Sequence, residues 1–337
     1  MTTQANAVEQ IFDCAVVGAG VSGLNCSMNL RFENKTTILA DTGQHPGGQA
    51  GSSSLIRNMP GFPGGISGPD LTVLMTRHAA EFGTTFRAPF YAGRLERADD
   101  HFVLIEMNGQ TIRAKTVVIA TGVQPRTLPD ATKAGQFIGF GVTYGFPSLN
   151  QSRWHDTEAV VMGSGNSGAQ AVQFLAGCNG CNVTMLVRRD TIRDSMSARV
   201  ADEIEKPRSN VKLLYNTELV EAIGEVGKLT HLKVKTPSGE QLIKTDHLFV
   251  NIGGDPPTRW LDKDLVPVNN AGYILTDRDL PEGVWADKSR PAFMCEASPG
   301  IFACGDVRFG NFRKRASMSA VDGANAAASV VQYLALK

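Results

Sequence analysis

The sequence lacks several features, and each absence excludes a class of protein. Its 337 residues contain no apolar run of the roughly 18 residues that a membrane-spanning helix needs. Neither sign of charge is in excess, because Lys plus Arg and Asp plus Glu each number 33. The chain therefore carries no overall basic field for nucleic acid and no acidic tail. We expect neither a membrane span nor a nucleic-acid partner.

Cysteine and histidine are also scarce. Six cysteines in a chain of this length do not form the dense framework of a disulfide-stabilised protein. The six histidines are scattered without metal-ligand spacing, so we expect no metal site. Residues 1–11 are polar and lack the apolar segment of a signal peptide. Together these features predict a cytoplasmic protein.

Glycine is the abundant residue type, with 35 copies, and its first cluster follows a buried strand. The apolar segment 11–17 runs directly into Gly18, Gly20 and Gly23, and a helix and a second strand ending at Asp41 come next. Glycines in this pattern allow a tight turn and let a pyrophosphate approach the start of the helix. An acid at the end of the second strand accepts hydrogen bonds from a ribose. This half predicts a dinucleotide site.

A second copy of the pattern begins 145 residues later. A strand at 159–162 precedes Gly163, Gly165 and Gly168, and a helix follows. The next strand ends at Arg188 and Arg189, with Arg193 further on, where the first copy has an acid. Positive charge at this position suits a ribose 2′-phosphate, so the second site is predicted to take NADPH. A solvated surface cluster of arginines is the alternative.

The order of these elements predicts an α/β fold in which the second half is inserted into the first. The strand expected over 300–307 and the helix expected over 317–334 resemble the end of the first sheet rather than a third domain. Residues 46–68 form a Gly-, Pro- and Ser-rich segment too long for an idle loop. Two different nucleotide sites indicate two cofactors, a bound flavin and a mobile nicotinamide.

At this point the chain resembles the low-molecular-weight thioredoxin reductases, a branch of the pyridine nucleotide–disulfide flavoproteins. The matching motifs run through nearly the whole chain: Gly18–Gly23, 47–49, Asn58 with 60–63, 66–68, 120–122, Gly163–Gly168, 187–189, 300–307 and 315–317. The resemblance implies two Rossmann-like domains of the three-layer ββα type. It implies an FAD domain over 1–125 and 255–337, an NAD(P)H domain over 126–254, and a homodimer.

The resemblance also implies which residues contact each cofactor. Those expected at FAD are Gly18, Gly20, Ser22, Gly23, Asp41, Gly48, Gln49, Asn58, Thr121, Gly122, Asp306, Arg315, Ala316 and Ser317. Those expected at NADPH are Gly163, Gly165, Asn166, Ser167, Arg188, Arg189 and Arg193.

One departure from the family pattern bears on function. Thioredoxin reductases of this type carry a redox-active CxxC just before the second glycine loop, but this chain has no cysteine between Cys26 and Cys178. A different CxxC, Cys178 and Cys181, is predicted in a turn away from the cofactor. It is either a displaced redox pair or two structural cysteines. These two and Tyr144 are the weak candidates for catalysis.

The sequence therefore leaves three functions open. The first is an FAD-dependent NADPH oxidoreductase that passes electrons directly to a ferredoxin, a quinone, a small disulfide or a pathway substrate. The second is a thioredoxin or disulfide reductase that uses Cys178 and Cys181 or the cysteines of a partner. The third is a non-catalytic sensor of flavin or NADPH.

Overall fold

The computed structural model describes residues 10–43, 45–281, 293–310 and 314–337. The chain divides into two compact units. The first unit comprises Met1–Gly51, Ile56–Gln124 and Asp255–Lys337, and the second comprises Ser52–Leu55 and Pro125–Gly254. Two short paired strands, β7 (Gln124–Pro125) and β16 (Gly254–Asp255), lie where the chain passes from one unit to the other.

The first unit is built on a mixed sheet with the order β17-β18-β6-β1-β2-β3, and β4 and β5 extend from β6. β18, β6, β1, β2 and β3 pair in parallel, whereas β17, β5 and β4 pair antiparallel. The strands are β1 (Ile11–Val17), β2 (Thr37–Ala40), β3 (Thr85–Arg87), β4 (Ala92–Arg97), β5 (Phe102–Glu106), β6 (Thr111–Ile119), β17 (Glu296–Ser298) and β18 (Ile301–Ala303).

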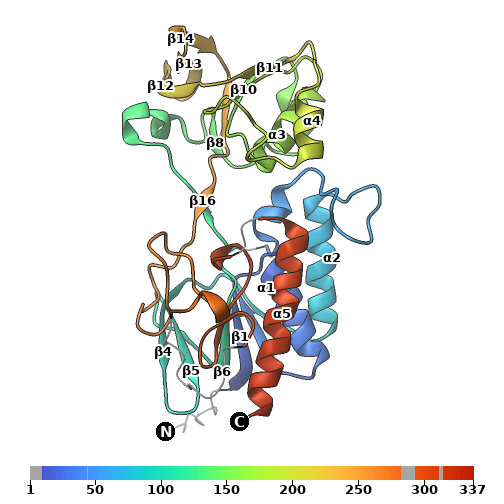
Figure 1. Cartoon of the computed structure of the whole chain (residues 1–337), viewed down its shortest axis with the longest axis vertical. Helices are drawn as coiled ribbons and strands as arrows, with labels where there is room; N and C mark the ends of the chain where they lie inside the picture. The colour runs from blue at the N-terminus through green and yellow to red at the C-terminus, as the bar shows by residue number, and fades with distance from the viewer. Residues whose placement is uncertain (1–9, 44, 282–292, 311–313) are drawn as a thin grey trace, which may run out of the picture. The chain divides into compact units, whose positions relative to one another are not determined.

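Three helices pack beside one another against this sheet (Figure 1): α1 (Val21–Phe32), α2 (Gly68–Glu81) and α5 (Ala316–Ala335). Short 3₁₀ turns are η1 (Gly48–Ser52), η5 (Asp277–Asp279) and η6 (Gly305–Val307). The hydroxyl of Ser67 accepts a hydrogen bond from the amide of Asp70 at 3.1 Å, and this cap begins α2. α1 instead has Gly20 at its N-cap, which leaves its first amides without a side-chain cap.

The second unit has a parallel sheet with the order β11-β10-β9-β15-β8 and a separate antiparallel sheet, β12-β13-β14. Its strands are β8 (Val142–Tyr144), β9 (Glu158–Met162), β10 (Asn182–Leu186), β11 (Val211–Leu214), β12 (Glu218–Glu225), β13 (Lys228–Thr236), β14 (Gly239–Lys244) and β15 (His247–Val250). Its helices are α3 (Asn166–Ala176) and α4 (Ala198–Ile204), with 3₁₀ turns η2 (Asp130–Thr132), η3 (Ala134–Phe137) and η4 (Gln151–Trp154).

The core of the first unit lies on both faces of its sheet, and β1 shows why. Cys14 and Val16 belong to the cluster that includes buried residues of α1 and α5, whereas Ala15 and Val17 belong to the cluster on the other face. Both sets of side chains are buried, so the strand reads as a continuous apolar run rather than an alternating one.

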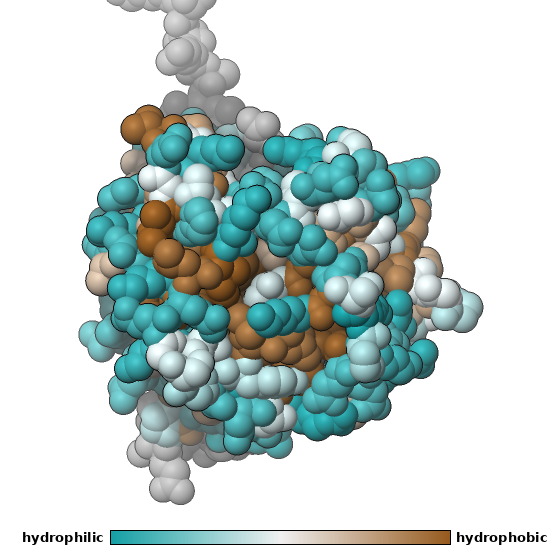
Figure 2. Space-filling model, turned by 90° about the horizontal axis from the view of Figure 1, so that it is seen from above, coloured by the Kyte–Doolittle hydropathy of each residue, from teal (hydrophilic) through white to brown (hydrophobic). Residues whose placement is uncertain are grey.

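On the face in Figure 2, polar residues cover most of the surface, with apolar patches between them, as in most globular proteins.

The predicted α/β class, with the second unit inserted into the first, is confirmed. The prediction of one strand over 300–307 was wrong in detail, because β18 ends at Ala303 and Gly305 begins the turn η6. Gly305 has a φ of +78°, a conformation that ends a strand. β12 was not predicted, since its sequence alternates poorly. No helix among the described residues is long and apolar enough to cross a membrane.

Candidate functional site

The first glycine loop joins β1 to α1. The chain packs tightly against Gly18 and Gly23, whereas the space beside Gly20 is open. A Cβ at Gly18 would lie 2.4 Å from the carbonyl oxygen of Ala120, and one at Gly23 would lie 1.8 Å from that of Gly18. A Cβ at Gly20, by contrast, would meet no atom of the described chain within 4 Å. The close contacts require glycine, and the open side lies at the N-terminus of α1. That end of a helix binds anions through free amides.

Asp41 follows β2 and lies against this loop. Its carboxylate accepts a hydrogen bond from the amide of Ala19 at 2.5 Å and another from the amide of Gly43 at 2.7 Å. Both bonds come from the backbone, so the carboxylate is held in one orientation at the end of the strand. This is the position that the sequence predicts for the acid that binds a ribose.

Two buried hydroxyls beside the loop test whether a nucleotide fits here. Within the described chain, Oγ of Ser22 and Oγ1 of Thr121 are buried and have no hydrogen-bond partner. Buried polar atoms are usually paired, and the described chain has others without a partner, at Thr84, His101 and Ser298. The two hydroxyls beside the loop are thus compatible with a bound nucleotide but do not identify one. Gly122, next to Thr121, has a φ of +63° and open space where its Cβ would stand. The residues present therefore fit the pyrophosphate and sugar of a dinucleotide.

Other predicted residues of this set also come together. A Cβ at Gly48 would lie 3.1 Å from Cα of Gly20, so the two segments touch. Nε2 of Gln49 donates to the carbonyl of Val123 at 2.5 Å. Nδ2 of Asn58 lies 3.5 Å from Oγ of Ser317, at the start of α5. Residues up to 259 positions apart thus meet in one unit. The remaining members are Arg315, at the N-cap of α5, and Ala316, its first residue.

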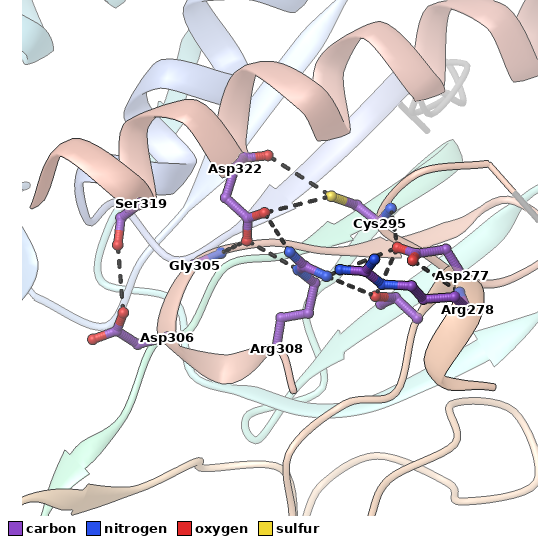
Figure 3. Close-up of polar contacts among 9 residues, drawn as sticks. Asp277, Arg278, Cys295, Gly305, Asp306, Arg308, Ser319 and Asp322 are labelled. Atoms are coloured by element: carbon purple, nitrogen blue, oxygen red, sulfur yellow. Dashed lines mark hydrogen bonds and ion pairs between the residues drawn. The ribbon is translucent and has the colours of Figure 1, made fainter. Parts of the chain in front are cut away.

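The turn Gly305–Val307 brings Asp306 to the same region (Figure 3). A Cβ at Gly305 would lie 2.9 Å from Cβ of Ser22, which places the turn against the start of α1. The hydroxyl of Ser319 on α5 donates to Oδ1 of Asp306 at 3.4 Å. Burial raises the pKa of Asp306 above its ordinary value. Asp306 is a partly shielded acceptor beside the glycine loop.

The second glycine loop repeats this geometry between β9 and α3. A Cβ at Gly163 would lie 2.1 Å from the carbonyl oxygen of Asn251, and one at Gly168 would lie 2.1 Å from that of Gly163. Gly165 precedes α3 and has open space around its Cβ position. Asn166 exchanges hydrogen bonds with Ser197, at 2.9 and 3.1 Å, and is thereby turned toward α4. Ser167 is exposed.

The three predicted arginines have different surroundings. Arg188 follows β10 and lines a shallow pocket of about 300 Å³, together with Asn216, Glu218, Lys235, Thr236 and Pro237. Arg189 lies 3.6 Å from the carboxylate of Asp194. Arg193 is paired with Glu205 and, at 2.9 Å, with Asp202, so its guanidinium is directed to α4. The structure therefore places Arg188, and not Arg193, at the pocket.

The chain matches a known protein family over nearly its whole length. Residues 12–328 match the family model described as pyridine nucleotide-disulphide oxidoreductase. The chain belongs to this family. It is 30% identical to thioredoxin reductase of Bacillus subtilis over 97% of the chain and 96% of that protein. It is 29% identical to a 34.2 kDa protein in the rubredoxin operon of Clostridium pasteurianum, over 97% and 98% of the two chains.

Solved structures of thioredoxin reductases have the same fold as this chain. The thioredoxin reductase of T. acidophilum is similar with a TM-score of 0.83 and 26% identity, over 98% of this chain and all of that one. The Lactococcus lactis enzyme is similar with a TM-score of 0.82 and 25% identity, over 97% and 100%. The chain is thus a pyridine nucleotide-disulphide oxidoreductase of the thioredoxin reductase type, an FAD-containing NAD(P)H oxidoreductase. The predicted cofactors, FAD and NADPH, are confirmed as those of this family.

Within this oxidoreductase, Cys178 and Cys181 are buried. Cys178 is 4% exposed and Cys181 is 1% exposed, and both belong to a hydrophobic core of the second unit. Cys178 Sγ donates to the carbonyl of Phe174 at 3.5 Å, and Cys181 Sγ accepts from the hydroxyl of Thr157 at 3.5 Å. Burial raises the pKa of both thiols. Raised pKa values and burial are the opposite of what a reactive thiolate needs.

The other four cysteines are also free and buried. Cys14, Cys26, Cys295 and Cys304 belong to one core cluster of the first unit. Burial raises the pKa of Cys14 to about 12, and a hydrogen bond with Cys304 together with burial raises that of Cys26. Among the described residues no group of His, Cys, Asp and Glu is arranged to hold a metal ion.

Tyr144 has a structural contact, since its hydroxyl accepts a hydrogen bond from the amide of Leu128 at 2.8 Å. Sequence reasoning missed Lys235, which reaches the Arg188 pocket from β13. No motif marks this lysine. Only the antiparallel sheet, which follows β11 in the chain, brings it there.

Proposed function

We propose that the first unit binds FAD and the second binds NADPH, with domains over 1–125 plus 255–337 and over 126–254. Support for the first assignment comes from the open glycine loop and the two unpartnered hydroxyls of Ser22 and Thr121, seen in the described part of the chain. Support for the second comes from Arg188 and Lys235, which line one shallow pocket together with Glu218 and give it a net positive charge. A 2′-phosphate is the nucleotide group that such charges favour.

We further propose that electrons from NADPH pass through FAD directly to an external acceptor, without an internal disulfide. Bound FAD supplies the chemistry that accepts hydride from the nicotinamide and releases electrons singly or in pairs. The observation that carries this proposal is the state of the thiols. The segment 145–148 has no cysteine, and Cys178 and Cys181 are enclosed in an apolar core.

The position of Cys181 supports the same conclusion. It lies directly before β10, whereas Arg188 lies after the opposite end of that strand. A strand of five residues spans about 17 Å. The cysteines therefore lie at the end of β10 opposite to the proposed NADPH site. The residues of this chain would then bind and orient the cofactors, and the acceptor would supply the remaining redox chemistry.

An anaerobic reductive titration tests the proposal. The wild-type protein should take up two electrons for each FAD, because no thiol pair adds capacity. A variant with Cys178→Ala and Cys181→Ala should give the same end point and reduce an artificial quinone at the wild-type rate. An end point of four electrons that falls to two in this variant would show that these cysteines are redox-active.

A disulfide reductase is the second candidate, because relatives that match nearly the full length bear the name thioredoxin reductase. The cysteines would then be Cys178 and Cys181, or would belong to a partner. Reduction of thioredoxin or of an aromatic disulfide by NADPH, lost in the double variant, would favour it over direct transfer. The redox-protein partner, the homodimer and the cytoplasmic location stay proposals at this level.

A further inference from the structure

Asp322 is a buried carboxylate that the predicted cofactor contacts do not include (Figure 3). It lies on α5 and is 6% exposed. Its Oδ2 accepts a hydrogen bond from the amide of Gly305 at 2.7 Å. Its two oxygens also accept Nη2 and Nε of Arg308, at 2.7 and 3.1 Å. Oδ1 also lies 3.8 Å from Sγ of Cys295, so the carboxylate is shared between a backbone amide, a thiol and a two-point contact with a guanidinium.

Arg308 is fixed on its other side as well. Its Nη1 donates to the hydroxyl of Thr276 at 3.2 Å and lies 3.8 Å from Oδ2 of Asp277. A buried ion pair of this kind is weak evidence for stability, because desolvation offsets much of the attraction. Its retention here calls for another reason, such as fixing the geometry of a neighbouring group.

The group that it fixes is the turn Gly305–Val307. Gly305 has a φ of +78°, and its amide is directed to Asp322. The next residue, Asp306, presents its carboxylate to the hydroxyl of Ser319. Ser319 and Asp322 are three residues apart and therefore lie on one face of α5. The helix thus contacts the turn twice, once at a backbone amide and once at the side chain of Asp306.

We propose that the Asp322–Arg308 ion pair is a positioning device for the FAD site. Asp322 fixes the amide of Gly305 and so sets the direction of the Asp306 carboxylate toward the hydroxyl groups of the cofactor. This inference rests on the proposed function, because it requires FAD beside Asp306. Asp322 and Arg308 are positioning residues and do not themselves contact the cofactor.

An apolar replacement of the pair separates positioning from stability. Arg308→Met with Asp322→Leu, combined with Asp277→Asn so that the carboxylate 3.8 Å from Arg308 is not left without a cation, removes the charges together, and the unfolding temperature of the flavin-free protein should stay near or above that of the wild type. FAD retention, measured as flavin fluorescence released when the yellow protein is diluted, should nevertheless weaken about tenfold. Asp277→Asn is the matched control, because it lies beside Arg308 but does not touch Gly305. It should retain FAD like the wild type.

Asp322→Glu provides a second variant in case the apolar pair does not fold. It keeps the charge opposite Arg308, but its longer side chain displaces the carboxylate from the Gly305 amide, so FAD retention should again fall. Arg308→Lys keeps the positive charge and the hydrogen bond between Asp322 and Gly305. This variant should hold FAD nearly as well as the wild type.

Wild-type retention in Asp322→Glu or in a folded apolar pair would overturn the inference alone. So would a loss of retention that merely follows a lower unfolding temperature in every variant. A wild-type protein that takes up no FAD would overturn the proposed function as well.

Discussion

At the residue scale, burial and the proposed cofactor contact favour different protonation states of Asp306. Burial raises its pKa above the ordinary value near 3.8, which means that the folded, flavin-free protein binds this proton more tightly than the unfolded chain does. The proposed role at FAD instead uses the ionised form as a hydrogen-bond acceptor. The native state without cofactor is therefore destabilised by this charge wherever the carboxyl is ionised.

Asp306→Asn should remove that destabilisation and weaken FAD binding. The stability lost to the carboxylate develops as the pH rises from about 3.8 through the raised pKa, so the variant should unfold at a higher temperature than the wild type near pH 7. The difference should vanish below pH 3.8. Thermal unfolding of the flavin-free proteins across this pH range measures it. FAD release on dilution should rise roughly ten- to a hundredfold, since a bond to a charged acceptor contributes about 1.5–3 kcal/mol. Equal unfolding temperatures at pH 7 would contradict the prediction.

Arg188 and Arg193 should differ in their effect on the choice of nucleotide. Arg188→Ala should raise the KM for NADPH about tenfold and leave that for NADH nearly unchanged, because one charge-assisted bond to the 2′-phosphate is lost. Lys235→Ala should act in the same direction. Arg193→Ala should have less effect, since its guanidinium is bound to Asp202 and Glu205.

Steady-state oxidation of both nucleotides with a quinone acceptor makes the comparison. Arg199→Ala, an exposed arginine on α4, is the control. A larger loss for Arg193 than for Arg188 would show that the ion pairs open when the nucleotide binds.

At the scale of elements, Gly165, which precedes α3, and Gly168, in the first turn of α3, are glycines for different reasons. Gly168→Ala would place a Cβ 2.1 Å from the carbonyl oxygen of Gly163, so helix and strand must move apart. Overpacking of this kind costs about 1–3 kcal/mol. Gly165→Ala meets no protein atom within 4 Å but projects toward the proposed nucleotide. Both variants should bind NADPH less tightly, and only Gly168→Ala should lower the unfolding temperature.

Nucleotide titration by fluorescence and thermal unfolding of the two variants test this difference. Both should keep their flavin absorbance, because the first glycine loop is intact. Unchanged NADPH binding in Gly165→Ala would show that the nucleotide does not lie over this loop.

The elements that the sequence predicted best are those with a local signal. Both glycine loops, the acid after β2 and the arginine after β10 follow from spacing along the chain, because each lies within one strand–helix–strand unit. The Gly305 amide bond to Asp322 and the approach of Lys235 to Arg188 have no such signal. They join residues from separate elements, and sequence periodicity does not report which surfaces meet after folding. Ion pairing of Arg193 to α4 was missed for the same reason.

At the scale of the whole molecule, the similarity to thioredoxin reductases runs along almost the entire chain of each relative. The fold is therefore shared from end to end, although only about a quarter to a third of the residues are identical. A scaffold does not determine which acceptor receives the electrons. Under the proposed function, the acceptor would be decided by where thiols are absent in this chain and where they are buried.

The insertion of the second unit also sets an order of events during synthesis. All residues of the second unit have been translated once Gly254 is made, whereas β18, which pairs with β6 within the first sheet, and α5 come later. Domains form as units while the chain leaves the ribosome, so the inserted unit should become protease-resistant on nascent chains that cannot yet retain flavin. Proteolysis of stalled nascent chains of increasing length would show this order. Flavin retention should begin only when the last helix has emerged, and the earlier strands must wait for it through the synthesis of more than half of the protein.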